Sequence, residues 1–508
     1  MAGVLGDRAL LDSVGHVGRL RDRSLLRRLP VKGGPGVNER ERVGRVGGEK
    51  GGRTGRTSGG EWSGRRVLVV GLGASGFAAA RALASLDAKV KVTEGATSEV
   101  IEERARRLRL EGVEVTTAGH DTEVVDADVA VVSPGIPPHA TVMTHLASAG
   151  IEVISEVELA FALARCDFVA VTGTNGKTTT TSLLASMLSE SGLHALAAGN
   201  IGLPLIDAVF EVPDDGVVAV EVSSFQLAGI REFRPRVAVL LNIAEDHTDW
   251  HGSFDNYIAS KARIAINQSS DDVFVVNSDD DAAMSVSEGV ASRVVPFSGS
   301  SVPDNGLGWD GDGLVWRGRE VLTADRVPLA GAAGREDVAA AAGAALEYGV
   351  DVDAVRRAVE SFQPLRHRLE VVARAGGVTY INDSKATNPH ATLAATKGLR
   401  DVVLIAGGRA KGIDLSALRA TVPPVVAVVA LGEASNEVAR AFVGLVEVTA
   451  VGSMHEAVGV ASAKAIPGGS VLLSPACASL DMYESYAQRG EAFSRAVRAI
   501  LSEQPEGE

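Results

Sequence analysis

The sequence predicts an α/β protein that contains several parallel sheets in series. From Val67 onward, short runs rich in Val, Ile and Ala alternate with Ala- and Leu-rich stretches of helical length. The short runs are apolar along their whole length, which is typical of strands whose sheet is covered by helices on both faces. A chain of 508 residues has room for roughly two to four domains, which argues against a single small binding module.

The expected strands are distributed along the whole chain after the first 64 residues. They lie at 67–71, 129–133, 168–173, 217–222, 237–242, 402–407, 426–432 and 471–475, with clear helices expected at 75–86 and 177–191. The strands end at or beside Gly, Ser, Asn, Pro or Glu. In open α/β sheets, ligands bind outside the carboxyl ends of strands, so these ends are the first places to look for chemistry.

The composition and net charge of the chain limit the classes of partner that it can bind. The chain has 50 Lys and Arg against 64 Asp and Glu, a formal charge of −14, which opposes non-specific attraction to nucleic acid or an anionic membrane. Two cysteines, Cys166 and Cys477, are consistent with a reducing cytosol. No apolar run reaches the roughly 18 residues that a membrane span needs. We expect a cytoplasmic monomer with no nucleic-acid partner and no membrane span.

Residues 1–64 differ from the rest of the chain. They are rich in Gly, Arg and Ser and lack apolar periodicity after Leu29, so they cannot bury enough surface to offset chain entropy. We expect a disordered basic tail rather than an arm for an anionic partner. Arg65 and Arg66 before an apolar run could mark an export signal, but Arg81 interrupts that run, which favours a strand, a turn and a helix.

The first strand ends in a glycine-rich turn, GLGASG at 71–76. Backbone N–H groups of such a turn and the dipole of the following helix can hold a diphosphate, and Glu94 ends the next strand where an acid can bind a ribose hydroxyl. Gly135, after another strand, permits close backbone approach to a ligand. The pattern favours a nucleotide or nucleotide sugar; an NAD-type dehydrogenase domain and a purely structural turn remain alternatives.

A second glycine-rich loop, VTGTNGKTT at 171–179, follows an apolar strand and opens a helix. The amides of Gly173 to Thr178 can converge on phosphate oxygens, Lys177 can neutralise the β and γ charges, and the Thr178 hydroxyl can bind Mg²⁺. The loop departs from the strict P-loop pattern because Val171 occupies the place of the first glycine. We nevertheless predict a nucleoside triphosphate site, against the alternative of a glycine-rich helix start with a solvated lysine.

Polar residues follow the next two strands. Glu221 ends one of them and could reach the metal of the phosphate loop, or could be a solvated strand-end residue. Asp246 and His247 lie just beyond the other, where they can hold or position a second metal. Lys261, in the expected helix SKARIAI, would by itself be a surface lysine.

Several longer motifs carry a family resemblance. GTNGKTT (173–179), GNIG (199–202), EVSSFQL (221–227), NIAEDHTDWHGSF (242–254) and YIASK (257–261) resemble the central ATPase domain of the Mur ligases, an amide-forming family that includes folylpolyglutamate synthases. LRHRLE (365–370), NDSKATN (382–388), GGRAKGID (407–414) and LSPACASLDMY (473–483) resemble the branch of that family that adds D-glutamate. The resemblance covers about 65–500, in the expected order, and leaves the tail outside it.

The resemblance implies a three-domain architecture. A Rossmann-like domain over 65–155 would bind the UDP sugar, a P-loop domain over 156–365 would bind ATP, and a Rossmann-like domain over 366–508 would bind the amino acid. The implied reaction joins D-glutamate to UDP-N-acetylmuramoyl-L-alanine through an acyl phosphate, with ATP and two Mg²⁺ ions, in peptidoglycan precursor synthesis. Family members also carry a carbamoylated lysine at the position of Lys261.

The resemblance also assigns roles to individual residues. It implies catalytic roles for Lys177, His247 and Lys261, and metal contacts for Thr178, Glu221, His247 and Lys261. The ATP contacts would be Gly173, Thr174, Asn175, Gly176, Lys177, Thr178, Thr179, Arg368 and Asp383. The UDP sugar would contact Gly73, Ala74, Ser75, Glu94, Gly135 and Asn200, and D-glutamate would contact Thr387, Lys411, Ser479 and Tyr486.

One segment departs from the family pattern. Where the family has Gly-x-His-Asn-x-x-Asn near adenine, this chain has GAAGRED at 331–337, so Ala333, Gly334 and Asp337 occupy the positions of His, Asn and Asn. Contacts to the base must therefore be weaker or replaced. A regulatory protein that binds a nucleotide sugar without catalysis is the alternative that this departure suggests.

Overall fold

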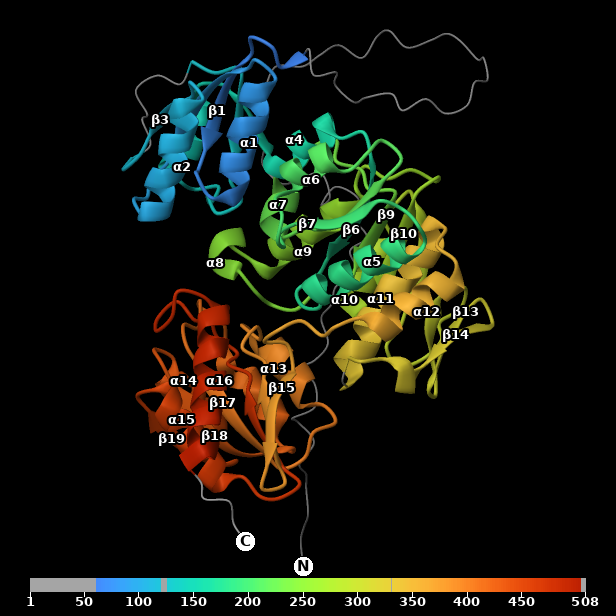
Figure 1. Cartoon of the computed structure of the whole chain (residues 1–508), viewed down its shortest axis with the longest axis vertical. Coiled ribbons are helices and arrows are strands. Elements are labelled where there is room, and N and C mark those ends of the chain that lie inside the picture. The colour runs from blue at the N-terminus through green and yellow to red at the C-terminus, as the bar shows by residue number, and fades with distance from the viewer. Residues whose placement is uncertain (1–60, 120–125, 330, 504–508) are drawn as a thin grey trace, which may run out of the picture.

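The computed structural model describes residues 61–119, 126–329 and 331–503, and three lobes follow one another down the molecule (Figure 1). The predicted tail, 1–64, lies outside the described residues except for its last four. Of those four, Trp62 is buried in the first core. Within the described ranges, no helix combines the length and apolar character needed to cross a bilayer.

The amino-terminal lobe is one parallel sheet with the order β3-β2-β1-β4-β5, which is the doubly wound order expected of a Rossmann-like domain. Its elements are β1 (Arg66–Val70), α1 (Ala74–Ser85), β2 (Lys89–Thr93), α2 (Glu99–Leu110), β3 (Glu114–Thr116), β4 (Val129–Val132), α3 (Thr141–Ser148) and β5 (Glu152–Ser155). Helix α1 starts at the glycine-rich turn, as the sequence predicts.

The central lobe contains a nine-stranded sheet with the order β14-β13-β12-β11-β10-β9-β6-β8-β7. Its elements are α4 (Glu156–Leu163), β6 (Asp167–Thr172), α5 (Lys177–Glu190), β7 (Ala195–Gly199), α6 (Leu205–Glu211), β8 (Val217–Glu221), α7 (Ser224–Ala228), β9 (Val237–Leu240), α8 (Thr248–His251), α9 (Phe254–Ala262), η3 (Arg263–Ala265), β10 (Val273–Asn277), α10 (Asp281–Ser287), β11 (Arg293–Phe297), β12 (Leu307–Asp310), β13 (Gly313–Trp316), β14 (Arg319–Thr323), η4 (Ala324–Arg326), α11 (Gly331–Tyr348) and α12 (Val352–Ser361). Strands β6 to β12 are parallel, as the sequence predicts, and the antiparallel strands β13 and β14 extend the sheet at one edge.

The carboxy-terminal lobe contains a six-stranded sheet with the order β15-β16-β20-β17-β18-β19. Its elements are β15 (Glu370–Ala375), β16 (Val378–Asn382), α13 (Pro389–Thr396), β17 (Val402–Gly407), η5 (Leu415–Thr421), β18 (Val425–Leu431), α14 (Ser435–Phe442), β19 (Glu447–Val451), α15 (Met454–Lys464), β20 (Ser470–Leu473) and α16 (Tyr486–Glu503). Only β15 runs antiparallel to its neighbour, so this sheet is also mixed. The antiparallel strands were missed because β15 and β12 to β14 contain charged, Gly or Trp residues that interrupt an apolar run.

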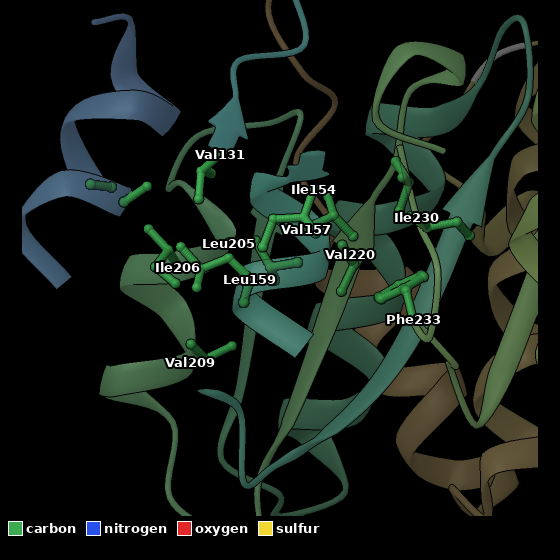
Figure 2. Close-up of a cluster of buried hydrophobic side chains, with 14 of the residues drawn as sticks. Val131, Ile154, Val157, Leu159, Leu205, Ile206, Val209, Val220, Ile230 and Phe233 are labelled. Carbon is green, nitrogen blue, oxygen red and sulfur yellow. The ribbon is translucent and has the colours of Figure 1, made fainter. Parts of the chain in front are cut away.

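The amino-terminal and central lobes share one apolar core. Figure 2 shows Val131 of β4 and Ile154 of β5 in the same cluster as Leu159 of α4 and Ile206 of α6. The cluster continues through Val220 into the central sheet. The cores of the carboxy-terminal lobe contain residues of that lobe alone, among the residues that the structure describes.

Candidate active site

The phosphate loop, residues 173–178, runs from the end of β6 into the first turn of α5. Gly176 has a φ of +83°, which L side chains rarely adopt, and a Cβ on Gly173 would lie 2.8 Å from the Cβ of Leu241. Among the described residues, no side chain caps the amino end of α5. Its backbone N–H groups and positive dipole end therefore remain available to an anion. Thr178 and Thr179 lie in the first turn of α5, with Thr178 half-buried and Thr179 buried.

The end of the neighbouring strand β9 holds this loop in place. The backbone N–H groups of Thr174 and Asn175 donate to the backbone oxygen and to Oδ1 of Asn242, at 2.9 and 2.8 Å. The Thr174 hydroxyl donates to the Ala244 oxygen at 3.1 Å and also lies 3.1 Å from the Tyr257 hydroxyl. The loop is thus ordered by protein contacts before any ligand binds.

Two lysines converge on the loop. Lys177 Nζ donates to the backbone oxygens of Gly173 and Thr174, both at 2.8 Å, and Lys261 Nζ donates to the Gly173 oxygen at 2.6 Å. Lys261 is 1% exposed, which overturns its interpretation as a surface lysine. Burial, reinforced by the charge of Lys177, holds the pKa of Lys261 well below its usual range. Burial also lowers the pKa of Lys177, although nearby Glu221 opposes that shift.

Glu221 ends β8, between β6 and β7, and is 2% exposed, so it is not a solvated strand-end residue. Its Oε1 accepts a hydrogen bond from Asn200 Nδ2 at 2.8 Å. Its Oε2 is buried and accepts none from any residue that the structure describes. A buried carboxylate oxygen without a hydrogen bond, close to two lysines and a phosphate loop, fits a cation ligand.

Asp246 connects the central and carboxy-terminal lobes. It is 5% exposed, and its Oδ1 lies 3.0 Å from Lys411 Nζ, which comes from the loop after β17. Its Oδ2 accepts from Asn388 Nδ2 at 3.2 Å. The net effect of Lys411, His247 and these hydrogen bonds is to lower the pKa of Asp246 in spite of its burial.

His247 occupies a strained position at the start of α8, with a φ of +53°. Its ring packs edge-on against Phe225 of α7, with centroids 4.7 Å apart, and its Nε2 lies 3.7 Å from Asp246 Oδ1. Within the described chain, no three His, Cys, Asp or Glu side chains gather closely enough to hold a metal by themselves. Any ion at Glu221 or His247 would therefore take further ligands from phosphate, water or other oxygen donors.

The remaining predicted ligands of the carboxy-terminal lobe lie on loops that follow its strands. Asp383 accepts from Ser474 Oγ at 2.9 Å, and burial raises its pKa to about 7, against the opposing charge of Arg368. Thr387 is half-buried in the loop between β16 and α13, and Ser479 is buried after β20. Tyr486, at the start of α16, is 36% exposed, and Lys385 Nζ lies 3.9 Å from its ring centroid.

The predicted UDP-sugar residues lie at two places. The turn carries Gly73, Ala74 and Ser75, of which the first two are exposed, and Gly135 is exposed after β4, whereas Asn200 lies after β7 in the central lobe. Glu94 accepts from the backbone N–H groups of Leu72 at 2.6 Å and Ala96 at 2.8 Å. Its carboxylate therefore orders the glycine-rich turn directly.

Comparison with known proteins agrees with this arrangement. Three family models match: the Mur ligase MurD-like amino-terminal domain at residues 65–155, the Mur ligase middle domain at 171–307 and the Mur ligase glutamate ligase domain at 367–477. The chain is 41% identical to the UDP-N-acetylmuramoylalanine--D-glutamate ligase of Acidobacterium capsulatum, over 86% of this chain and 97% of that protein. The chain belongs to the Mur ligase family. This family is ATP-dependent, so this Mur ligase uses ATP.

Other relatives and solved structures extend the comparison. The Desulfosudis oleivorans protein of the same name is 42% identical to this Mur ligase, over 87% of this chain and 97% of its own. The UDP-N-acetylmuramate-alanine ligase MurC of Thermotoga maritima has a TM-score of 0.55 at 18% identity, covering 87% of this chain and all of the other. MurF of Acinetobacter baumannii has a TM-score of 0.57 at 18% identity, covering 82% and 91%. These two structures share the three-lobed α/β fold.

The sequence did not reveal what Asp337 of this Mur ligase contacts. Its Oδ1 accepts from the Thr180 hydroxyl on α5 at 3.1 Å, and a Cβ on Gly176 would lie 2.4 Å from that oxygen. Burial and the charge of Glu336 raise the pKa of Asp337 to about 8, so the carboxyl is held mainly as the neutral acid at pH 7. The departure at 331–337 therefore places an acid directly against the phosphate loop. The only sequence signal was an acidic residue at a position where the family has Asn.

Proposed function

We propose that this Mur ligase joins D-glutamate to UDP-N-acetylmuramoyl-L-alanine in the cytoplasm and converts ATP to ADP and phosphate, as one step of peptidoglycan precursor synthesis. The observation that carries the proposal is the convergence of groups from two lobes. Lys261 and Glu221 lie beside Lys177 at the phosphate loop, and nearby Asp246 pairs with Lys411 of the carboxy-terminal lobe. The names of the two relatives described above, both UDP-N-acetylmuramoylalanine--D-glutamate ligases, support the choice of substrates.

The chemistry explains why cations must gather here. A carboxylate is a poor electrophile, so the γ-phosphoryl group of ATP is first transferred to an oxygen of the acceptor carboxylate. ADP leaves, and an acyl phosphate forms. The amine of D-glutamate then attacks the acyl carbon, phosphate leaves, and the nitrogen loses a proton as the amide forms. Lys177 neutralises the crowded phosphates when it exchanges its two backbone acceptors for ATP oxygens.

The buried oxygen of Glu221 and the Thr178 hydroxyl fit one Mg²⁺ ion, and His247 fits a second. Bound Mg²⁺ would supply positive charge against the phosphate oxygens. Lys261 is proposed to be carbamoylated: its neutral amine attacks the carbon of CO₂, an N–C bond forms as one C=O π bond opens onto oxygen, and the nitrogen loses a proton to give the carbamate. The burial that lowers the pKa of Lys261 favours the neutral amine that this modification requires.

The other lobes are proposed to present the two remaining substrates. The turn with Gly73, Ala74 and Ser75, together with Glu94 and Gly135, would hold the UDP sugar of the acceptor, and Asn200 would contact it from the central lobe. Arg368 and Asp383 would contact ATP. Thr387, Lys411, Ser479 and Tyr486 would hold D-glutamate, with Lys411 pairing one of its carboxylates after it leaves Asp246. A monomer with three domains, at 65–155, 156–365 and 366–508, is sufficient for this scheme.

The experiment that tests this proposal is phosphate release from ATP across a panel of amino acids with the UDP-linked acceptor. We expect turnover that requires both the acceptor and D-glutamate and that falls at least about a thousandfold in Lys177→Ala. The matched control is Lys89→Ala, which removes an exposed lysine at the first position of β2 in the amino-terminal lobe.

Two other outcomes would overturn the proposal. Faster turnover with L-glutamate and a folate, or with meso-diaminopimelate, would move the chain elsewhere in the family. Binding of UDP-linked acceptor without any ATP turnover would favour the regulatory alternative, and saturable NAD binding at residues 71–76 would favour the dehydrogenase alternative.

A further inference from the structure

The contact between the phosphate loop and the carboxy-terminal lobe centres on Asn388. This residue is 2% exposed and caps α13: its Oδ1 accepts from the Ala391 N–H at 2.9 Å. The two hydrogens of its Nδ2 are directed to Asn175 Oδ1 and Asp246 Oδ2, both at 3.2 Å. Because the cap fixes the amide, the direction of both donated hydrogen bonds is fixed by the start of the helix.

A second residue from the same helix end reaches the same loop residue. Asn175 Nδ2 donates to His390 Nδ1 at 2.9 Å and makes a longer contact of 3.4 Å with Asn388 Oδ1. The imidazole must carry its proton on Nε2 for Nδ1 to accept this bond. Asn175 is itself fixed on the central lobe, because its backbone N–H donates to Asn242 Oδ1. The side chain of Asn175 is therefore a second link between the two lobes, beside Asp246.

The residues of this link lie next to residues that are proposed to bind ATP and D-glutamate. Asn388 ends the loop that starts at Asp383 and contains Thr387, two residues proposed to contact ATP and D-glutamate. Its other partner, Asp246, pairs with Lys411, which is proposed to contact D-glutamate. The contacts of Asn388 thus connect the phosphate loop with two of the segments that would present D-glutamate, the loops that carry Thr387 and Lys411.

We propose that Asn388 and His390 are positioning residues that dock the carboxy-terminal lobe on the phosphate loop through Asn175, so that the ATP and amino-acid sites are assembled together. This inference rests on the proposed function, because it assigns the pair to the same reaction. Neither side chain needs to contact a reacting atom. Their role is to hold the loops 383–388 and 408–414 at a set distance from the phosphates.

Three variants of the full chain test the role of the pair. His390→Ala removes the acceptor, whereas His390→Asn returns an amide oxygen near the place of Nδ1. Asn388→Ser keeps a side chain that can cap α13 but removes both donated hydrogen bonds. The matched control is His455→Ala, because exposed His455 follows the cap of α15 by two residues, as His390 follows the cap of α13.

The readouts are kcat and the KM values for ATP and D-glutamate, measured by phosphate release, together with the melting temperature. We expect His390→Ala to raise both KM values about threefold to tenfold, the range of one lost hydrogen bond, with little change in melting temperature. Asn388→Ser should raise them by about tenfold or more, and His390→Asn should recover most of the wild-type values. His455→Ala should change none of them.

Two outcomes would overturn the inference. One is unchanged KM values in both His390→Ala and Asn388→Ser. The other is a fall in melting temperature without a rise in either KM, which would indicate a purely structural role. Failure of the proposed function is a separate result, because the wild-type chain itself would then release no phosphate with D-glutamate and the UDP-linked acceptor.

Discussion

The central lobe meets its two neighbours in opposite ways. Towards the amino-terminal lobe it shares a continuous apolar core, in which Leu159 and Ile206 are fully buried beside Val131 (Figure 2). Towards the carboxy-terminal lobe its described contacts include hydrogen bonds and an ion pair, centred on Asn175 and Asp246.

Buried carboxylates anchor α4, the helix that directly follows the last strand of the amino-terminal lobe. Glu158 of α4 accepts from the backbone N–H groups of Arg231, Glu232 and Phe233 at 2.7 to 3.1 Å. Glu156, at the start of the same helix, accepts from the Ile206 N–H at 2.9 Å. Such contacts fix α4, and with it the exit from β5, within the central lobe without involving any predicted ligand residue.

The two interfaces differ in what they do: the apolar interface stabilises the fold, and the polar interface assembles the proposed active site. Apolar burial is non-directional and always present, so the amino-terminal lobe and its turn keep a fixed relation to the phosphate loop. The polar interface includes Asn175 and Lys411, which are proposed to contact ATP and D-glutamate. Under that proposal, bound ligands replace some of its polar contacts, and the carboxy-terminal lobe moves at a smaller cost in free energy than the amino-terminal lobe would.

The largest expected effect comes from the apolar interface. Ile206→Ala should lower the free energy of unfolding by about 2–5 kcal/mol, because it leaves a cavity in the core that two lobes share. Thermal or denaturant unfolding measures this change. Phe210→Ala, on the same helix but 56% exposed, should stay within about 0.5 kcal/mol of wild type. Equal effects of the two substitutions would contradict the assignment of a shared core.

The next largest effect is expected at the polar interface, where a substitution should lower activity rather than stability. Lys411→Ala should lower kcat/KM by about a hundredfold or more, because it removes a partly buried cation from Asp246 and from the proposed glutamate site. The melting temperature should change little, since the lobe keeps its own cores. Arg409→Ala is the control, because its side chain is 51% exposed and pairs with exposed Glu433. A large loss of stability in Lys411→Ala, with activity retained, would reverse the comparison.

A smaller effect concerns Asp337 beside the phosphate loop. Its pKa is raised from 3.8 to about 8 in the folded chain, so folding takes up a proton between these pH values. This contribution to stability therefore falls as pH rises across that window, and Asp337→Asn removes the dependence. The melting temperature of the variant should exceed that of wild type by about 2–5 °C more at pH 8 than at pH 5.

Asp304→Asn, which changes an exposed carboxylate in the loop before β12, is the control for this experiment and should show no such pH-dependent offset. An offset in Asp337→Asn that is constant with pH would show that Asp337 does not titrate in this window.

Residues next to strand ends could be predicted, because a parallel sheet brings those ends to one edge. Gly173 and Asn200 follow strands β6 and β7, Glu221 ends the strand β8 that lies between them, and Asn200 contacts Glu221 directly. The partners of Asp246 could not be predicted in this way. Lys411 lies 165 residues away on another lobe, and only the packing of the two lobes joins them.

The burial of individual polar residues also could not be predicted from the sequence. Lys261 lies on an amphipathic-looking helix, and nothing in its local pattern shows that Tyr257 and the phosphate loop would enclose it. The Asn-Pro pair at 388–389 is a typical helix start, but it does not reveal that the capping amide also reaches Asn175. The shared core could not be predicted from the sequence, because an apolar run does not indicate which lobe its side chains will pack against.

The most direct test of the contrast between the two interfaces is amide hydrogen exchange on the full chain, with and without a non-hydrolysable ATP analogue and the UDP-linked acceptor. We predict added protection in the phosphate loop 173–178 and in the loops 383–388 and 408–414, with no change in 156–163 and 204–211. Unchanged exchange in the carboxy-terminal loops, together with altered exchange at 204–211, would contradict the account.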